Sequence, residues 1–134
     1  MPTFDVFKPF LTPKSMPTLT LYTKIFYNTL MTITDQEKKR IKQLLVNDLK
    51  DISAIQKIII FGSFLHSNTP NDLDLAIIDN SNQDYLSLAL SYRKKIRNIT
   101  EIIPVDLIPI HSINQEPTTP MEIAILNGET IYEK

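Results

Sequence analysis

Two aspartates separated by a single residue are the first feature of the sequence that could carry chemistry. Asp72 and Asp74 lie in the segment Asp-Leu-Asp-Leu. On a β-strand, residues i and i+2 face the same side, so the two carboxylates would point together and Leu73 and Leu75 would face the other way. Two carboxylates this close repel, and one stays protonated unless a cation lies between them. Mg²⁺ suits such a pair because it is a hard ion that prefers oxygen ligands.

A pair of solvated surface aspartates is the competing interpretation. The chain contains nine aspartates in 134 residues, which gives a chance expectation of roughly 0.6 Asp-x-Asp patterns. Taken alone, the pair therefore favours the surface interpretation. The metal interpretation needs further residues that point to the same place.

Gly62 and Ser63 supply a second feature, directly after an apolar strand. Gly62 is one of only two glycines in the chain. A glycine lets the backbone approach a phosphate closely, and the following turn offers N–H groups and a serine hydroxyl to an anion. Gly-Ser also commonly ends a strand without binding anything. The phosphate interpretation is favoured because the loop over 64–71 returns the chain directly to Asp72.

Asp106 is the third candidate, in the apolar segment 102–108. A charged carboxylate is costly to bury among apolar residues and needs a partner or a metal. The alternative is an aspartate that faces water from an edge strand, and Pro104 suits an edge because it has no N–H to donate. Beside Asp72 and Asp74 we favour a metal ligand.

The elements that must position these residues can be predicted from capping signals and apolar spacing. Thr34 with Glu37 and Thr119 with Glu122 form capping boxes that begin helices. Within the helix predicted over 84–98, the core candidates are Leu86, Leu90, and either Tyr92 or Ile96. The predicted elements are a helix over about 35–50, strands over 57–61 and 73–78, a helix over 84–98, a strand over 102–108, a short helix from 119 that ends at Asn127-Gly128, and a strand over 130–132.

This order predicts an α/β (α+β) fold with a mixed β-sheet and helices packed on it. A doubly wound sheet does not follow, because the order leaves open whether the second and third strands are parallel. We expect a domain over residues 31–134 and an irregular N-terminal extension over residues 1–30, where four of the nine prolines fall within the first 17 positions. One hypothesis is that Met31 is the biological start.

Composition narrows the class of protein. The net charge is −1, the chain has no cysteines, and no apolar run reaches the 18 or so residues of a membrane span. Thiolate metal sites and disulfides are excluded, and we expect a cytoplasmic protein with no membrane partner. We do not expect direct nucleic-acid binding. The cluster Arg93-Lys94-Lys95-Ile96-Arg97 is typical of a helix C-terminus, although contact with phosphates, RNA or an acidic partner stays open.

Gly62-Ser63, followed after eight residues by Asp72-x-Asp74 and later by Asp106, resembles the DNA polymerase beta-like nucleotidyltransferase superfamily. The likeness is greatest to its minimal form, the MNT-type domain, and covers roughly residues 34–134. The ending from 123 to 133 is also similar to the way these domains finish.

The resemblance implies a role for each residue of the pattern. Gly62 and Ser63 would bind the triphosphate of ATP. Asp72 and Asp74 would hold two Mg²⁺ ions, and Asp106 would ligate one of them and help to activate the attacking hydroxyl. Two metal ions of this kind stabilise both the attacking and the leaving oxygen of an in-line displacement.

The resemblance also implies a partner, because minimal domains of this kind often pair with a HEPN-type ribonuclease toxin and act as its antitoxin. We therefore expect transfer of a nucleotide, AMP from ATP, to a hydroxyl on a partner protein. Family members often carry an arginine soon after Gly-Ser, where this chain has Phe64, Leu65 and His66. A weak or inactive domain that neutralises its partner by contact is thus the alternative. A purely structural domain whose aspartates bind no metal is the third hypothesis.

Overall fold

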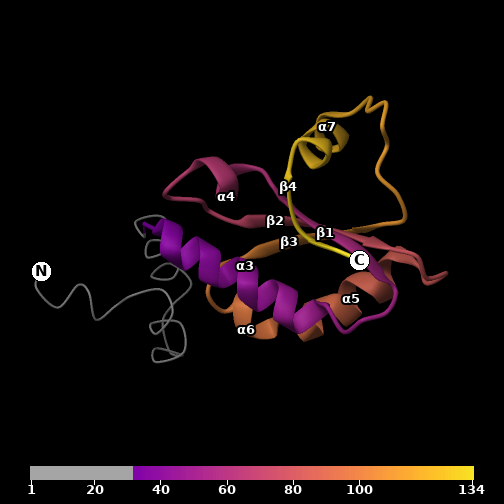
Figure 1. Ribbon diagram of the computed structural model, residues 1–134, viewed down its shortest axis with the longest axis horizontal. Coiled ribbons are helices and arrows are strands. Elements are labelled where there is room, and N and C mark those ends of the chain that lie inside the picture. The colour runs from indigo at the N-terminus through magenta and orange to yellow at the C-terminus, as the bar shows by residue number, and fades with distance from the viewer. Residues whose placement is uncertain (1–31) are drawn as a thin grey trace, which may run out of the picture.

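The computed structural model describes residues 32–134, and the predicted N-terminal extension lies outside the described residues. Its elements form one four-stranded sheet with helices on both faces (Figure 1). The helices and strands are α3 (Asp35–Leu49), β1 (Ile55–Phe61), α4 (Ser63–His66), β2 (Leu73–Asp79), α5 (Tyr85–Lys95), α6 (Arg97–Thr100), β3 (Val105–Ile110), α7 (Pro120–Leu126) and β4 (Glu129–Glu133).

The sheet is mixed, as predicted, with the strand order β3-β2-β1-β4. Strand β1 pairs antiparallel with both β2 and β4, whereas β2 and β3 are parallel. The parallel pair is made possible by α5 and α6, which form the crossover between β2 and β3. Strand β3 is an edge strand, in agreement with the proline just before it.

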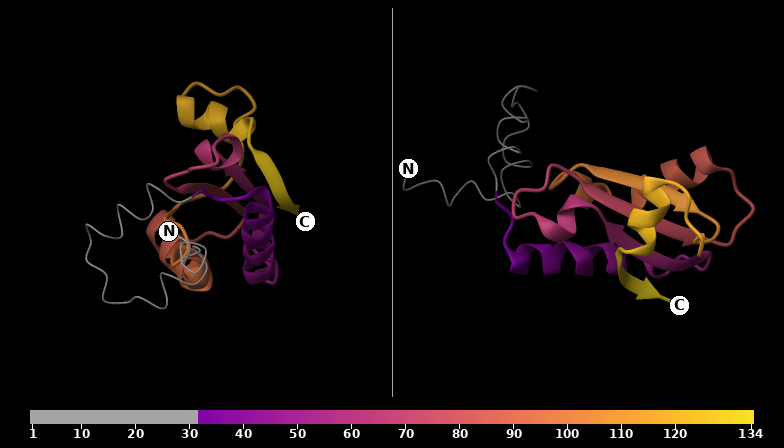
Figure 2. Two further views of the ribbon diagram at one scale, coloured as in Figure 1. Left: turned by 90° about the vertical axis from the view of Figure 1, so that its left-hand side faces the viewer. Right: turned by 90° about the horizontal axis from the view of Figure 1, so that it is seen from above.

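Two apolar layers lie on opposite faces of this sheet. The larger core lies beneath α3, α5 and α6, and the smaller one lies beneath α7 (Figure 2, left). Alternate strand residues divide between them: Leu73 and Leu75 point into the larger core, and Ala76 and Ile78 into the smaller one. Even-numbered residues of β2 therefore face α7, and this face also carries Asp72 and Asp74.

Both capping boxes that the sequence predicts are present. The Thr34 hydroxyl accepts the Glu37 N–H while the Glu37 carboxylate accepts the Thr34 N–H, and Thr119 and Glu122 repeat the arrangement at α7. Each box satisfies two N–H groups that have no partner within the helix. These local contacts explain why the starts of both helices agree with the prediction.

Three details of the sequence-based prediction are wrong. The helix predicted over 84–98 is broken at Ile96, so that α6 follows α5 as a separate turn. The strand predicted over 102–108 begins only at Val105, because the preceding residues form turns with Ile99. The predicted core residues Leu86 and Leu90 are 66% and 58% exposed.

Candidate active site

Strands β2 and β3 bring the three predicted carboxylates together. In the parallel ladder Asp74 lies directly opposite Asp106, and Asp72 lies one strand position before Leu73, which pairs with Val105. One carboxylate oxygen from each of the three aspartates lies within 4.8 Å of the others. Because all three are on the α7 face, the carboxylates converge there.

The electrostatics of this cluster are unfavourable without a cation. Partial burial, with the neighbouring carboxylates of Asp72 and Asp106, raises the pKa of Asp74 to about 6. Partial burial and the Asp106 carboxylate also raise the pKa of Asp72. The side chains of Asp72 and Asp74 each lie within hydrogen-bond reach of the Asp106 carboxyl group, and apart from these carboxyl groups no donor of residues 32–134 bonds to any of the three. The cluster therefore concentrates hydrogen-bond acceptors and negative charge that a bound cation would neutralise.

The turn after β1 lies against the middle carboxylate of the cluster. Phe61 pairs with Asp74 in the antiparallel ladder, so Gly62 comes next to it. Gly62 has φ 80° and ψ −155°, a conformation that L side chains rarely adopt. A Cβ atom at this position would overlap Oδ2 of Asp74. Glycine is therefore required twice, by the backbone conformation and by the aspartate.

Ser63, the other residue predicted to bind phosphate, begins the helical turn α4 and is exposed. The rest of the turn is anchored inward, because Phe64 is fully buried in the larger core. Thus Gly62 and Ser63 lie at the end of β1 that adjoins the carboxylates, as the sequence predicts. His66 is exposed and His111 is a surface residue whose Nδ1 lies 3.0 Å from the Asp79 carbonyl oxygen.

Lys38 supports this turn and was missed from the sequence. Its Nζ donates a hydrogen bond of 2.6 Å to the carbonyl of Ser67 and lies 5.4 Å from the centre of the Phe64 ring. The side chain is 8% exposed. A signal was available, since Lys38 precedes Ile41 by three residues and so belongs to the buried stripe of α3.

The donor set fits a hard divalent cation. Mg²⁺ binds carboxylate oxygens in proteins. Asp72, Asp74 and Asp106 offer three such groups that lie close together. Asp106 is exposed and Asp72 and Asp74 are half-buried, so the oxygens are accessible to an ion that keeps some of its water and to a phosphate. The residues can thus hold a metal–phosphate complex beside the Gly62 turn.

No helix within residues 32–134 has both the length and the apolar content that a membrane span requires.

Comparisons with known proteins place this geometry in a family. No curated protein matches the sequence. Among solved structures, the chain is similar to a chain of the tri-AMPylated Shewanella oneidensis HEPN toxin in complex with MNT antitoxin, at 19% identity and a TM-score of 0.47, covering 72% of this chain and 73% of that one. The profile of the family "Polymerase beta, Nucleotidyltransferase" matches residues 39–134, which contain the glycine turn and all three carboxylates. The chain therefore belongs to the polymerase beta nucleotidyltransferase family.

Proposed function

We propose that this protein is a Mg²⁺-dependent nucleotidyltransferase that transfers AMP from ATP to a hydroxyl group on a partner protein. The observation that carries the proposal is the meeting of three carboxylates, with oxygens within 4.8 Å, beside a turn that only glycine can form. Such an arrangement has no structural purpose among the described residues, because partial burial and the neighbouring carboxylates raise the pKa of Asp72 and of Asp74 and so disfavour their charged forms.

In the proposed reaction, Asp72, Asp74 and Asp106 bind metal, and Asp106 also acts on the acceptor. Bound Mg²⁺ supplies charge neutralisation at the phosphate oxygens. The carboxylate of Asp106, the most exposed of the three, orients the acceptor hydroxyl and takes its proton. The acceptor oxygen forms a bond to the α-phosphorus while the bond to the bridging oxygen of the β-phosphate breaks, and pyrophosphate leaves. Gly62 and Ser63 hold the triphosphate through backbone N–H groups and the serine hydroxyl.

We further propose that the acceptor is a HEPN-type toxin, that the pair works as a toxin–antitoxin system, and that it acts in the cytoplasm. The motif order supports the partner class, since it resembles the minimal members of the family. The described residues also support an acceptor from another molecule, because residues 32–134 form a single sheet with its packed helices and include no separate acceptor-binding unit.

The test is an incubation of the purified chain with ATP labelled at the α-phosphate, Mg²⁺ and the product of the adjacent gene. We expect label on a tyrosine, serine or threonine of that protein, release of one pyrophosphate per AMP transferred, and loss of both when Mg²⁺ is chelated. Pyrophosphate release without a labelled protein would overturn the proposed acceptor. An unlabelled partner with no pyrophosphate release would overturn the enzyme.

A contact antitoxin without turnover is the second candidate, and one observation favours it. The turn α4, which follows Gly62, contains no lysine or arginine to bind the triphosphate. The nearby ammonium group of Lys38 is already bonded to Ser67. Under this alternative the chain binds its partner tightly and inhibits it equally well when Asp74→Asn is introduced, whereas the enzyme loses its effect on the partner.

A further inference from the structure

Helix α5 carries apolar residues on two opposite sides, and only one side is buried. Leu88, Tyr92 and Ile96 pack into the larger core. Leu86 and Leu90, one turn apart, are 66% and 58% exposed. The two sets are offset by two residues, or about 200° around a helix, so they lie on opposite sides. An exposed leucine stripe on a helix that is already packed is a feature of interaction surfaces.

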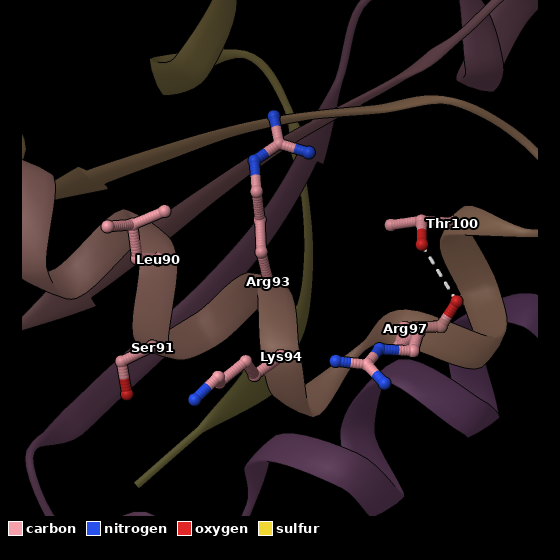
Figure 3. Close-up of a pocket in the computed structure, with 6 residues that line it drawn as sticks. All are labelled: Leu90, Ser91, Arg93, Lys94, Arg97 and Thr100. Carbon is pink, nitrogen blue, oxygen red and sulfur yellow. Dashed lines mark hydrogen bonds between the residues drawn. The ribbon is translucent and has the colours of Figure 1, made fainter.

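The exposed stripe continues into a basic cavity of about 560 Å³ between α5 and α6 (Figure 3). It is lined by Leu90, Ser91, Arg93, Lys94, Arg97 and Thr100. The lining holds three cations and no carboxylate. No carboxylate of residues 32–134 forms an ion pair with Arg93, Lys94 or Arg97. Leucine followed by uncompensated positive charge therefore forms one continuous strip, the α5–α6 surface.

The basic end of this strip reaches the edge strand that carries Asp106, although α5 and α6 pack on the opposite face of the sheet from the carboxylates. The guanidinium of Arg93 donates a hydrogen bond of 3.1 Å to the carbonyl of Val105. Val105 is the first residue of the edge strand β3, and the next residue is Asp106. The α5–α6 surface thus lies around the edge of the sheet from the carboxylates, at the same end of β3.

Helix capping by cations explains only part of this arrangement. Lysine and arginine in the last turn of α5 interact favourably with its C-terminus. This accounts for neither Arg97, which belongs to α6, nor the exposed leucines. A single-stranded RNA ligand is also a poor match, because bases stack on aromatic side chains. The residues that line the cavity include Leu90 and no aromatic side chain.

We propose that the α5–α6 surface docks an acidic, amphipathic helix of the protein acceptor. Leu86 and Leu90 would pack against its apolar side chains, and Arg93, Lys94 and Arg97 would pair with its carboxylates about one or two turns further along. This inference rests on the proposed function for the identity of the partner as the acceptor. Docking at the end of β3 would hold the acceptor next to Asp106, where a hydroxyl has to be presented.

The test uses the full chain and a synthetic helical peptide that carries leucines four residues apart followed by glutamates, labelled for fluorescence anisotropy. We expect binding that weakens about tenfold in the double variant Lys94→Glu with Arg97→Glu and that also weakens in Leu90→Ser. Lys39→Glu with Lys50→Glu, two charge reversals at exposed positions of α3 and its C-cap, is the matched control and leaves binding unchanged. Circular dichroism of each variant checks that it is folded.

Two further arms separate this proposal from its alternatives. A peptide with glutamine in place of glutamate should bind at least about tenfold more weakly; equal binding, or an unchanged affinity in the double variant, would overturn the proposal. An RNA oligonucleotide of equal charge that binds more tightly than the peptide would overturn it too. Asp74→Asn should bind the peptide normally, so a failure of the proposed chemistry is distinguishable from a failure of the docking surface.

Discussion

Strand β2 carries two aspartates whose surroundings differ completely. Asp79, near its C-terminal end, is fully buried, and its carboxylate accepts hydrogen bonds from the Tyr92 hydroxyl and, at 2.6 Å, from the Ser81 N–H. Asp74, five residues earlier, faces the opposite side of the sheet and has two other carboxylates for neighbours. Asp79 is thus surrounded by hydrogen-bond donors, whereas the nearest polar neighbours of Asp74 are two further carboxylates, which are acceptors.

The difference shows how a structural carboxylate can be told from a functional one. A buried carboxylate that is surrounded by donors contributes to the stability of the fold. A carboxylate such as that of Asp74, whose pKa is raised by partial burial and by neighbouring carboxylates, is unfavourable in its charged form, and a bound cation would relieve this. Four experiments can test whether Asp74 serves function and Asp79 serves stability.

Asp74→Asn should abolish the transfer of AMP without harming the fold. Removing a metal ligand costs several kcal/mol of transition-state stabilisation, which corresponds to a loss of about 10³-fold in rate. The free energy of unfolding should stay equal or rise, because the substitution removes a repulsive charge. Pyrophosphate release and chemical denaturation measure the two quantities.

Asp84→Asn is the control for this substitution, because it makes the same chemical change at an exposed helix N-cap where asparagine caps equally well. Its rate and stability should match those of the unchanged protein. If Asp74→Asn retained most of the transfer rate, the contrast between Asp74 and Asp79 would lose its functional meaning.

Gly62→Ala should disturb the site through Asp74. A non-glycine residue in this conformation costs about 1–3 kcal/mol, and the added Cβ displaces the Asp74 carboxylate. We therefore expect lower stability together with weaker Mg²⁺ binding, measured by denaturation and by calorimetry.

Gly128→Ala provides a comparison, since its Cβ would lie 2.7 Å from the Ile60 carbonyl oxygen and its nearest atoms all belong to β1, with no carboxylate among them. It should lower stability but leave Mg²⁺ affinity intact. Equal losses of affinity in the two variants would mean that Gly62 acts only through general destabilisation.

Tyr92→Phe should remove a hydrogen bond to Asp79 and lower the stability of the fold without changing the transfer reaction. Removing the hydroxyl leaves the buried Asp79 carboxylate with one donor fewer, and a hydrogen bond to a charged group contributes about 1.5–3 kcal/mol. We expect a drop of that size in the free energy of unfolding, with the AMP-transfer rate of the folded protein unchanged at a temperature well below the unfolding midpoint. A selective loss of rate would show that the two ends of β2 are functionally coupled.

The pH dependence of stability should show the smallest effect. The pKa of Asp74 is about 6 in the metal-free fold, against about 3.9 for an unfolded chain. The unfolded state loses this proton first, so the contribution of Asp74 to stability declines as pH rises from about 4 to about 6 and is then constant. Denaturation at pH 4.5 and pH 7, with Asp74→Asn as reference, should reveal the decline, and Mg²⁺ should reduce it. A difference between the two pH values that persists unchanged in Asp74→Asn would contradict this assignment.

Much of the fold could be predicted because its signals are local. The capping boxes at Thr34 and Thr119 fixed the helix starts, and the alternation of Asp72, Leu73, Asp74 and Leu75 predicted which side each would face. The chemical identity of the site also came from the sequence, since residue type and spacing are enough to suggest carboxylates on one strand face beside a glycine turn. Metal binding and catalysis by these residues stay predictions.

Local spacing cannot distinguish the two leucine-containing pairs of α5, and only long-range packing does so. Leu86 with Leu90 and Leu88 with Tyr92 are both i, i+4 pairs on α5, and only the packing of the helix over β3 determines which pair is buried. The same holds for Asp106, whose position opposite Asp74 follows from a parallel pairing between strands that are connected through two helices. Residues distant in the chain meet only when the whole sheet has formed, because no short-range contact specifies a neighbour thirty residues away.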